Sequence, residues 1–107
     1  MDESLDLKFA ALADPTRLAI LARLARGEAS VTDLAAPFAL SQPAISKHLR
    51  VLERAGLIEA GRAAQSRPRR LRRDAIAEPA QWLERLGGDW SAKFDRLDAY
   101  LAKGDTE

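Results

Sequence analysis

The segment of residues 33–55 constrains the fold more strongly than any other part of this sequence. Thr32 and Ser41 both have side chains that cap helix N-termini, and a helical apolar pattern follows each of them. Pro37 lacks the amide donor that a helix interior needs, so we expect the first helix to be short or distorted. The second helix should end at Gly56, a residue suited to a left-handed C-terminal cap. The sequence therefore predicts two helices joined by a tight turn.

The second of these helices has two chemically different faces when its residues are placed at about 100° per residue. Ile45, Leu49 and Leu52 share an arc of about 60°, so they should pack on the preceding helices. Another face is polar and basic and has no bulky apolar side chain. It carries Gln42, Pro43, Ser46, Lys47 and Arg50. A helix that enters the major groove of DNA needs such a face. An ordinary amphipathic surface helix has the same pattern, so both interpretations stay open here.

The polar side chains on this helix suit different parts of a DNA duplex. Gln42 can form two hydrogen bonds with adenine, and Ser46 can donate or accept one. Lys47 can reach guanine or a phosphate. Arg50 and Arg54 lie further along the helix and are better placed for the sugar-phosphate backbone. We therefore expect base reading near the helix start and phosphate binding beyond it.

His48 is the only histidine, and it lies next to the apolar arc. We expect it to pack and to form a local hydrogen bond, with a phosphate contact as the second interpretation. The chain has no cysteine, so no second His or Cys is present to complete a metal-ligand set. No nucleophile beside a base and no pair of catalytic carboxylates appears as a local pattern. The sequence thus predicts no metal, no cofactor and no enzymatic activity.

Positive charge is concentrated in the middle of the chain, although the net charge is only +1. Residues 41–73 hold nine Lys and Arg residues against two acidic ones, and acidic residues outnumber basic ones on both flanks. Such a block suits a phosphate-facing surface, because each neutralised phosphate releases condensed counterions. A solvated basic face is the alternative interpretation.

Residues 57–73 are expected to form a hairpin. Its arms would be Leu57 to Arg62 and Arg67 to Arg73, with residues 63–66 at the tip. Pro68 cannot donate to a strand ladder, so it should lie at an edge or near the tip.

The N-terminal third is expected to contribute two further helices. Leu5, Phe9 and Leu12 form an apolar stripe, and Asp14 followed by Pro15 is typical of a helix start. This second helix should run to about residue 25 and stop at residue 27, a glycine, and residues 29–31 could add a short strand.

The C-terminal third shows a heptad-like pattern of apolar residues. They recur at steps of three and four, and they are Leu83, Leu86, Trp90, Phe94, Leu97 and Leu101. A helix is expected over about residues 75–103, and the part from Pro79 to Lys103 alone would be roughly 37 Å long. A core this small cannot cover that length, so part of the pattern should contact a second subunit. Trp82 and Trp90 could instead line a small-molecule pocket, but core or dimer contacts are favoured.

With 107 residues the chain fits a single domain, residues 1–107. It has no apolar run approaching the roughly 18 residues of a membrane span, and its start lacks the layout of a signal peptide. We therefore expect a cytoplasmic protein without membrane partners.

Three blocks of sequence, in order, resemble the ArsR/SmtB family of bacterial winged-helix repressors. The strongest is Ser41-Gln-Pro-Ala-Ile-Ser-Lys-His-Leu-Arg-Val-Leu-Glu-Arg-Ala-Gly-Leu-Ile; the others are Ala11-Leu-Ala-Asp-Pro-Thr-Arg-Leu-Ala-Ile-Leu and Val31-Thr-Asp-Leu-Ala. The resemblance covers nearly the whole chain. It implies a mainly α-helical winged helix-turn-helix fold with a small β-hairpin, the wing, and a long C-terminal dimerisation helix.

The resemblance also implies where DNA and a second subunit would bind. The family's DNA-facing positions fall on Ser41, Gln42, Pro43, Ser46 and Lys47, with wing arginines such as Arg62 and Arg67 on the backbone. The polar helix face adds Arg50 to the expected DNA-binding set, and the basic block adds Arg69 and Arg70. The homodimer would be built from the first and last helices, through Leu5, Phe9 and the heptad-like residues. The predicted function is a dimeric repressor of a two-fold-symmetric operator; the alternative is a winged-helix protein-interaction adaptor that does not bind DNA.

The chain departs from the family pattern in two places. Metal-sensing members carry cysteine pairs in the third helix, or histidine and carboxylate sets in the last, and this chain has no Cys or His in either region. The familiar metal sites are therefore not expected, and any small-molecule effector stays unidentified. The wing has Ala64 where a glycine is usual, and it carries Pro68, so its length and twist are not predicted.

Overall fold

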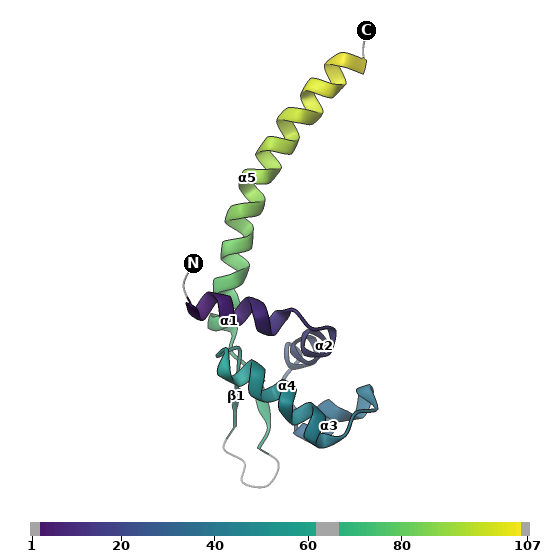
Figure 1. Ribbon diagram of the computed structural model, residues 1–107, viewed down its shortest axis with the longest axis vertical. Coiled ribbons are helices and arrows are strands. Elements are labelled where there is room, and N and C mark those ends of the chain that lie inside the picture. The colour runs from purple at the N-terminus through teal and green to yellow at the C-terminus, as the bar shows by residue number, and fades with distance from the viewer. Residues whose placement is uncertain (1–2, 62–66, 106–107) are drawn as a thin grey trace.

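The computed structural model describes residues 3–61 and 67–105. The chain forms α1 (Glu3–Leu12), α2 (Pro15–Leu24), α3 (Val31–Ala35), the 3₁₀ turn η1 (Ala36–Phe38), α4 (Gln42–Arg54), β1 (Ile58–Ala60), β2 (Arg69–Leu71) and α5 (Arg73–Asp105). Helices α1 to α4 gather at one end with the hairpin below them, and α5 extends away from this body (Figure 1). The mainly α fold with a small hairpin is confirmed.

Local capping explains where α2 and α4 begin. The Asp14 carboxylate accepts a hydrogen bond from the Arg17 amide at 3.0 Å, with Pro15 at the first helical position. The Ser41 hydroxyl accepts one from the Ala44 amide at 3.3 Å. Gly56 has a φ of 76° and follows α4 in the left-handed conformation, as expected. The predicted N-caps Asp14 and Ser41 and this C-terminal glycine are confirmed.

The region around α3 differs from prediction in two details. Ser30, not Thr32, caps α3, because its hydroxyl accepts from the Asp33 amide at 3.1 Å. Residues 29–31 form no strand: Ala29 makes an isolated bridge with Arg69, and α3 begins two residues later. Pro37 does shorten the helix as predicted, since α3 ends at Ala35 and continues only as the 3₁₀ turn η1.

The hairpin is shorter than its predicted arms. Its register pairs Ile58 with Leu71, Glu59 with Arg70 and Ala60 with Arg69 in antiparallel strands of three residues each. Pro68 lies beyond the last pair, where its missing amide removes no ladder bond, and its carbonyl accepts from the Gly61 amide at 2.6 Å. The predicted tip lies outside the described residues.

Helix α5 begins earlier than predicted, at Arg73, and ends at Asp105. The amides of Ala75 and Ile76 both donate to the Arg72 carbonyl at 3.1 Å, and both side chains pack against the core. Pro79 lies inside the helix, as in the expected range of about residues 75–103, although it leaves one carbonyl without its helical partner. At about 1.5 Å per residue the helix is about 50 Å long.

The core lies where α1, α2, α3, α4 and the hairpin meet. Ile45, Leu49 and Leu52 on α4 are at most 1% exposed, which confirms the apolar face that the sequence predicts. They form one cluster with Ile20, Leu21, Leu24, Leu34, Leu57 and Ile58. Burying each such side chain is worth about 1.5–3 kcal/mol, so this cluster fixes α4 on the body with its polar face outward.

The first turns of α5 attach to α1 through two side-chain contacts. Phe9 and Trp82 form an edge-to-face pair with ring centroids 5.4 Å apart. Lys8 is buried, and its Nζ lies 3.4 Å from the Glu78 Oε1. Beyond this junction Leu83, Leu86, Leu97 and Leu101 are 41–52% exposed. In the part of the chain that the structure describes, no helix is both long and apolar enough to cross a membrane.

Candidate nucleic-acid interface

The outer face of α4 presents polar and basic side chains to solvent. Ser41, Gln42, Pro43, Lys47 and Arg50 are exposed and Ser46 is half-buried, so all six predicted groove-facing residues reach the surface. Over residues 3–61 and 67–105, no hydrogen bond or ion pair holds the side chains of Lys47 and Arg50. These two cations are therefore available to phosphates.

Gln42 is held in place by the preceding helix. Its Nε2 donates to the Thr32 Oγ1 at 3.1 Å, which connects the first turn of α4 to the start of α3. A glutamine amide has two N–H donors and a carbonyl acceptor, so one donor and the acceptor remain for a base edge. Sequence reasoning assigned Thr32 to capping and missed this contact. Thr32 instead orients the side chain that is best suited to read adenine.

A polar recess separates the first half of α4 from the hairpin. It has a volume of about 380 Å³ and is lined by Ser30, Val31, Thr32, Gln42, Ser46, Arg67 and Arg69. Four of these residues carry hydroxyl or amide groups that can donate or accept hydrogen bonds, and two are arginines. The recess therefore brings both predicted base-reading residues, Gln42 and Ser46, next to wing arginines.

Arg69 differs from its predicted role as a backbone contact. Its Nε donates to the Glu53 Oε1 at 2.5 Å, and the arginine side chain is only 15% exposed. A second guanidinium nitrogen donates to the carbonyl of Arg67. Both of these contacts are internal. Arg69 therefore attaches the wing to α4 and has little surface left for a phosphate.

The other wing arginines are more accessible. Arg70 pairs with Glu59 across the strands at 2.6 Å, but both side chains are exposed, at 58% and 43%. Such a pair is worth at most about 1 kcal/mol in water, so a phosphate can replace the carboxylate. Arg67 is exposed beside the recess. Arg62, the fourth predicted contact, lies outside the described residues.

His48 is half-buried and forms a hydrogen bond, but with a residue 31 positions away rather than with the local partner that the sequence predicts. The Arg17 Nη1 donates to the His48 Nδ1 at 3.3 Å. The Arg17 Nε also donates to the Ala11 carbonyl at 2.7 Å. Arg17 thus joins the end of α1 to α4, a role that sequence reasoning missed. The sequence feature that could have indicated this role is the position of Arg17 in the block of residues 11–21, which resembles the family.

Groups around Asp14, next to the contact between Arg17 and His48, lower the pKa of the Asp14 carboxyl below its usual value of 3.8. The main cause is the hydrogen bond from the Arg17 amide, and the positive charge of Arg17 acts in the same direction. The His48 Nδ1 lies 3.8 Å from the Asp14 Oδ2. The cap of α2 is therefore ionised at neutral pH and is held by the helix that carries the polar face.

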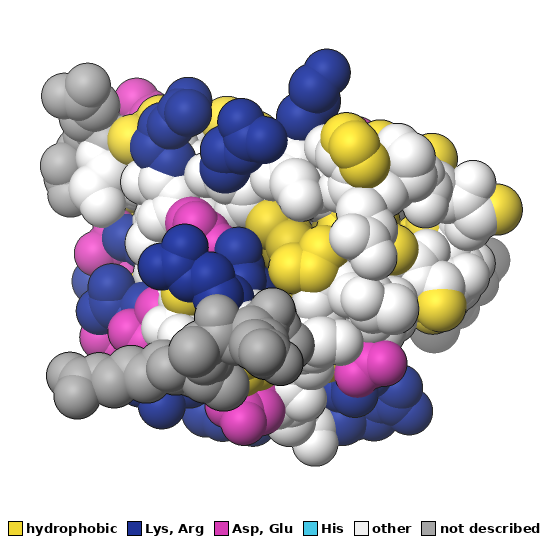
Figure 2. Space-filling view, turned by 90° about the horizontal axis from the view of Figure 1, so that it is seen from below, with side chains coloured by type: hydrophobic (Ala, Val, Ile, Leu, Met, Phe, Trp, Pro, Cys, Tyr) yellow, Lys and Arg dark blue, Asp and Glu magenta, His cyan; other side chains and the backbone are white. Residues whose placement is uncertain are grey.

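Seen from below, the end of the molecule that bears the hairpin is bordered by several groups of Lys and Arg side chains (Figure 2). Asp and Glu side chains lie among them, so the charge is mixed rather than uniform. Within residues 3–61 and 67–105, no three His, Cys, Asp or Glu side chains are placed to hold a metal ion.

Comparison with known proteins places the similarity over this same region. A family model described as a helix-turn-helix domain matches residues 12–60. The chain is 48% identical over 56 residues to the HTH-type transcriptional regulator NmtR of Mycobacterium tuberculosis, which is 52% of this chain and 47% of that protein. It is 35% identical over 75 residues to the transcriptional repressor SdpR of Bacillus subtilis, 70% of this chain and 83% of that protein. The match spans about half the length of the first curated relatives.

Solved structures are similar over most of the chain. An ArsR family transcriptional regulator is 37% identical with a TM-score of 0.75, and the match covers 83% of this chain and 98% of that one. A homodimeric winged helix-turn-helix DNA-binding domain of a possible ArsR-family regulator from Mycobacterium bovis is 28% identical with a TM-score of 0.67, over 86% and 84% of the two chains. The likeness therefore includes the hairpin and the start of the long helix.

Proposed function

Because the chain belongs to the ArsR/SmtB family of winged helix-turn-helix transcriptional regulators, we propose that it is a homodimeric repressor that binds a two-fold-symmetric DNA operator. One observation carries the proposal: α4 is fixed by its buried apolar face and presents Gln42, Ser46, Lys47 and Arg50 outward. A helix with this outward face fits the major groove, which is wide enough for an α-helix.

Base reading is assigned to the first turns of α4. Gln42 is oriented by Thr32 and retains one donor and its acceptor, the pair of groups that adenine requires. Ser46 lines the same recess, one helical turn further on. Ser41 and Pro43 lie at the helix start, where their small exposed side chains allow the helix to approach the base edges closely. These residues supply specificity.

Phosphate binding is assigned to side chains around that centre. Lys47, Arg50 and Arg54 are exposed on α4, and Arg67 and Arg70 are exposed on the wing. Each neutralised phosphate adds affinity that does not depend on sequence and that falls with salt. Arg69 is not assigned to DNA, since Glu53 already neutralises it.

Dimerisation is assigned to the part of α5 beyond its junction with α1. Leu83, Leu86, Leu97 and Leu101 keep the heptad-like spacing and are exposed in the single chain. Leu7 on α1 is also 44% exposed, whereas the predicted Leu5 is already buried by its own chain. The structural relative from M. bovis is described as homodimeric, which supports this assignment. Trp90 and Phe94 stay predicted interface residues.

A repressor of this kind acts by covering promoter DNA, and the name of the relative SdpR supports repression over activation. The decisive experiment selects bound fragments from random duplex DNA with the purified protein and sequences them. We expect a two-fold-symmetric motif with half-sites about one helical turn apart, or a multiple of that distance.

The matched variants separate base reading from general DNA affinity. The double variant Gln42→Ala with Ser46→Ala should bind the selected site at least about tenfold more weakly, with little change on unrelated DNA. Arg85→Gln, an exposed substitution on α5, should bind like the wild type. Equal loss on both DNA sequences would contradict base reading. Failure to select or shift any DNA would favour a protein-interaction adaptor.

A further inference from the structure

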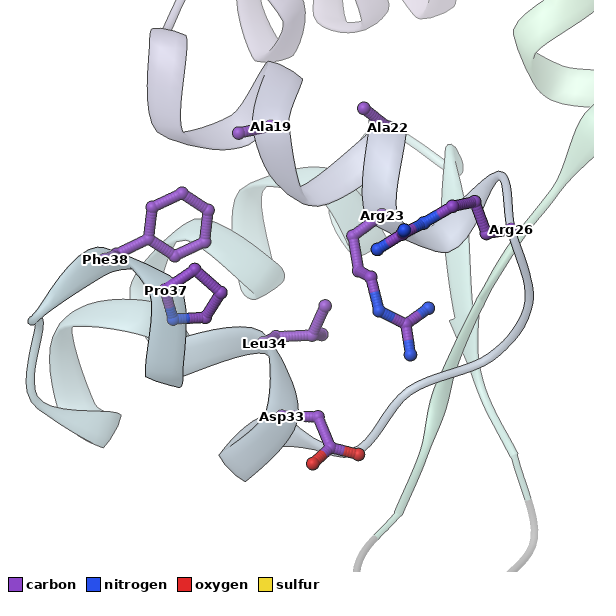
Figure 3. Close-up of a pocket in the computed structure, with 8 residues that line it drawn as sticks. All are labelled: Ala19, Ala22, Arg23, Arg26, Asp33, Leu34, Pro37 and Phe38. Atoms are coloured by element: carbon purple, nitrogen blue, oxygen red, sulfur yellow. The ribbon is translucent and has the colours of Figure 1, made fainter.

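A second recess lies between α2 and the segment formed by α3 and η1. Its volume is about 550 Å³, and Figure 3 shows the eight side chains that surround it. The α2 wall is formed partly by Ala19 and Ala22, whose small side chains leave the space open. The facing wall exists because Pro37 ends α3 and turns the chain into η1. This size is within the range of pockets that hold small organic molecules.

The floor of this pocket is apolar. Leu34 is buried at its base, and Pro37 and Phe38 form the side opposite α2 (Figure 3). Phe38 is only partly buried, although it packs against the core cluster. An aromatic ring or a short alkyl chain would cover these groups and remove apolar surface from water.

One edge of the pocket is basic. Arg23 lies on α2, one turn after Ala19, and Arg26 lies in the turn that follows α2; both side chains extend along the opening (Figure 3). The Arg23 Nη1 donates to the Gly27 carbonyl at 3.1 Å, which fixes this guanidinium and leaves its other N–H groups for a ligand. The Arg26 side chain forms no hydrogen bond or ion pair with the residues that the structure describes.

Asp33 is the one carboxylate on the pocket wall, so two guanidinium groups face a single negative charge. No ion pair joins Asp33 to either arginine within the described part of the chain. The pocket therefore carries an excess positive charge beside an apolar floor. Planar guanidinium groups bind carboxylates with paired hydrogen bonds.

We propose that this pocket binds a small organic carboxylate whose apolar part lies on Leu34, Pro37 and Phe38 and whose carboxylate binds Arg23 and Arg26. Neutral apolar molecules would pack on the apolar floor but would form no ion pair with the arginines. Small inorganic anions would bind the arginines but would bury no apolar surface on the floor. The combination selects an anion with a ring or alkyl chain.

The pocket is linked to α4 through α3. One wall is α3, and Thr32 on α3 holds Gln42 at the first turn of α4. A ligand that separates α3 from α2 would move this contact and change the outer face of α4. The regulatory consequence rests on the proposed DNA-binding function: the bound carboxylate weakens operator binding, because it favours an arrangement of α3 and α4 that fits DNA less well.

Ligand binding is tested first, by calorimetry on the full chain without DNA. The probes are phenylacetate, octanoate and the neutral analogue phenylacetamide. At least one carboxylate should bind saturably with one site per chain, and phenylacetamide should bind at least about tenfold more weakly than phenylacetate. Arg26→Gln should weaken carboxylate binding by a similar factor, and Ala22→Leu should remove it by filling the pocket. Arg85→Gln is the control and should bind normally.

Four results would overturn the pocket assignment. They are no saturation by either carboxylate below about 10 mM, equal binding of phenylacetamide, no effect of Arg26→Gln, and an altered oligomeric state of Ala22→Leu, which would identify a second copy as the occupant. Circular dichroism verifies that each variant is folded.

Regulation is tested separately on the selected operator. A saturating carboxylate probe should weaken operator binding by about tenfold in the wild type and not in Ala22→Leu, which has no space for the probe. Ligand binding without any change in operator affinity would overturn the regulatory role alone. Absence of DNA binding under all conditions would overturn the proposed function, while calorimetry would still decide whether the pocket binds carboxylates.

Discussion

The Arg69 Nε donates to the Glu53 Oε1 at 2.5 Å, and this ion pair joins the second strand of the wing to the last turns of α4. The pair is largely shielded, with side-chain exposures of 15% and 33%. The wing therefore keeps a defined position beside α4, and the charge of Arg69 is used within the chain.

Removing the carboxylate should destabilise the protein, because the guanidinium then stays shielded without its partner. We expect Glu53→Gln to lower the free energy of unfolding by about 1–2 kcal/mol, measured by chemical denaturation. The matched control is Glu59→Gln, whose exposed pair with Arg70 should contribute at most about 0.5 kcal/mol. Equal effects of the two substitutions would show that shielding does not distinguish the pairs.

The salt dependence of DNA binding should distinguish phosphate contacts from Arg69. Lys47→Gln and Arg50→Gln should each reduce the slope of log affinity against log salt by about one unit, on specific and unrelated DNA alike. Arg69→Gln should leave the slope unchanged, because Glu53 already neutralises that charge in the free protein. Fluorescence anisotropy at several salt concentrations measures all three. A reduced slope for Arg69→Gln would restore its predicted role as a phosphate contact.

Asp14 makes a pH-dependent contribution to stability. Its pKa is lowered in the folded chain, chiefly by the Arg17 amide, so the folded state favours the ionised carboxylate. This contribution is present above the unfolded pKa, near 3.8, and is lost as the pH falls through the folded value. Asp14→Asn can still cap α2 but cannot ionise. Between about pH 5 and pH 3, the wild type should therefore lose stability more steeply than the variant in parallel thermal unfolding experiments.

Charged residues on the exposed face of α5 should disrupt the dimer without unfolding the body. The double variant Leu83→Glu with Leu97→Glu should sediment as a monomer in analytical ultracentrifugation, because it places charges where apolar surface would be buried. Its affinity for the two-fold-symmetric operator should fall at least about tenfold, since two half-sites can no longer be bound together. Gln81→Glu, also exposed on α5, is the control and should remain dimeric. A double variant that stays dimeric would exclude this face as the interface.

The sequence alone was sufficient for most features whose deciding interaction is local, although it placed the cap of α3 on Thr32 rather than Ser30. The caps at Asp14 and Ser41 each involve a residue three positions away, and the apolar face of Ile45, Leu49 and Leu52 follows from helical spacing. The break after Ala35 follows from Pro37, because a proline's effect on its helix is intrinsic. These local features were enough to predict the paired helices, the hairpin and the outward polar residues of α4.

Only the tertiary structure determined which polar side chains already have a partner within the chain. Arg69 and Glu53 are 16 residues apart, Gln42 and Thr32 are 10 apart, and Arg17 and His48 are 31 apart. Charge and residue type are the same for a free arginine and a paired one, so sequence could not separate Arg69 from Arg67. The exact start of α5 at Arg73, two residues before the expected one, was likewise decided by packing, because Ala75 and Ile76 gain contacts with the core. The sequence determined the helices and their faces; long-range partners, which depend on distance in space rather than along the chain, determined which residues remain free to bind.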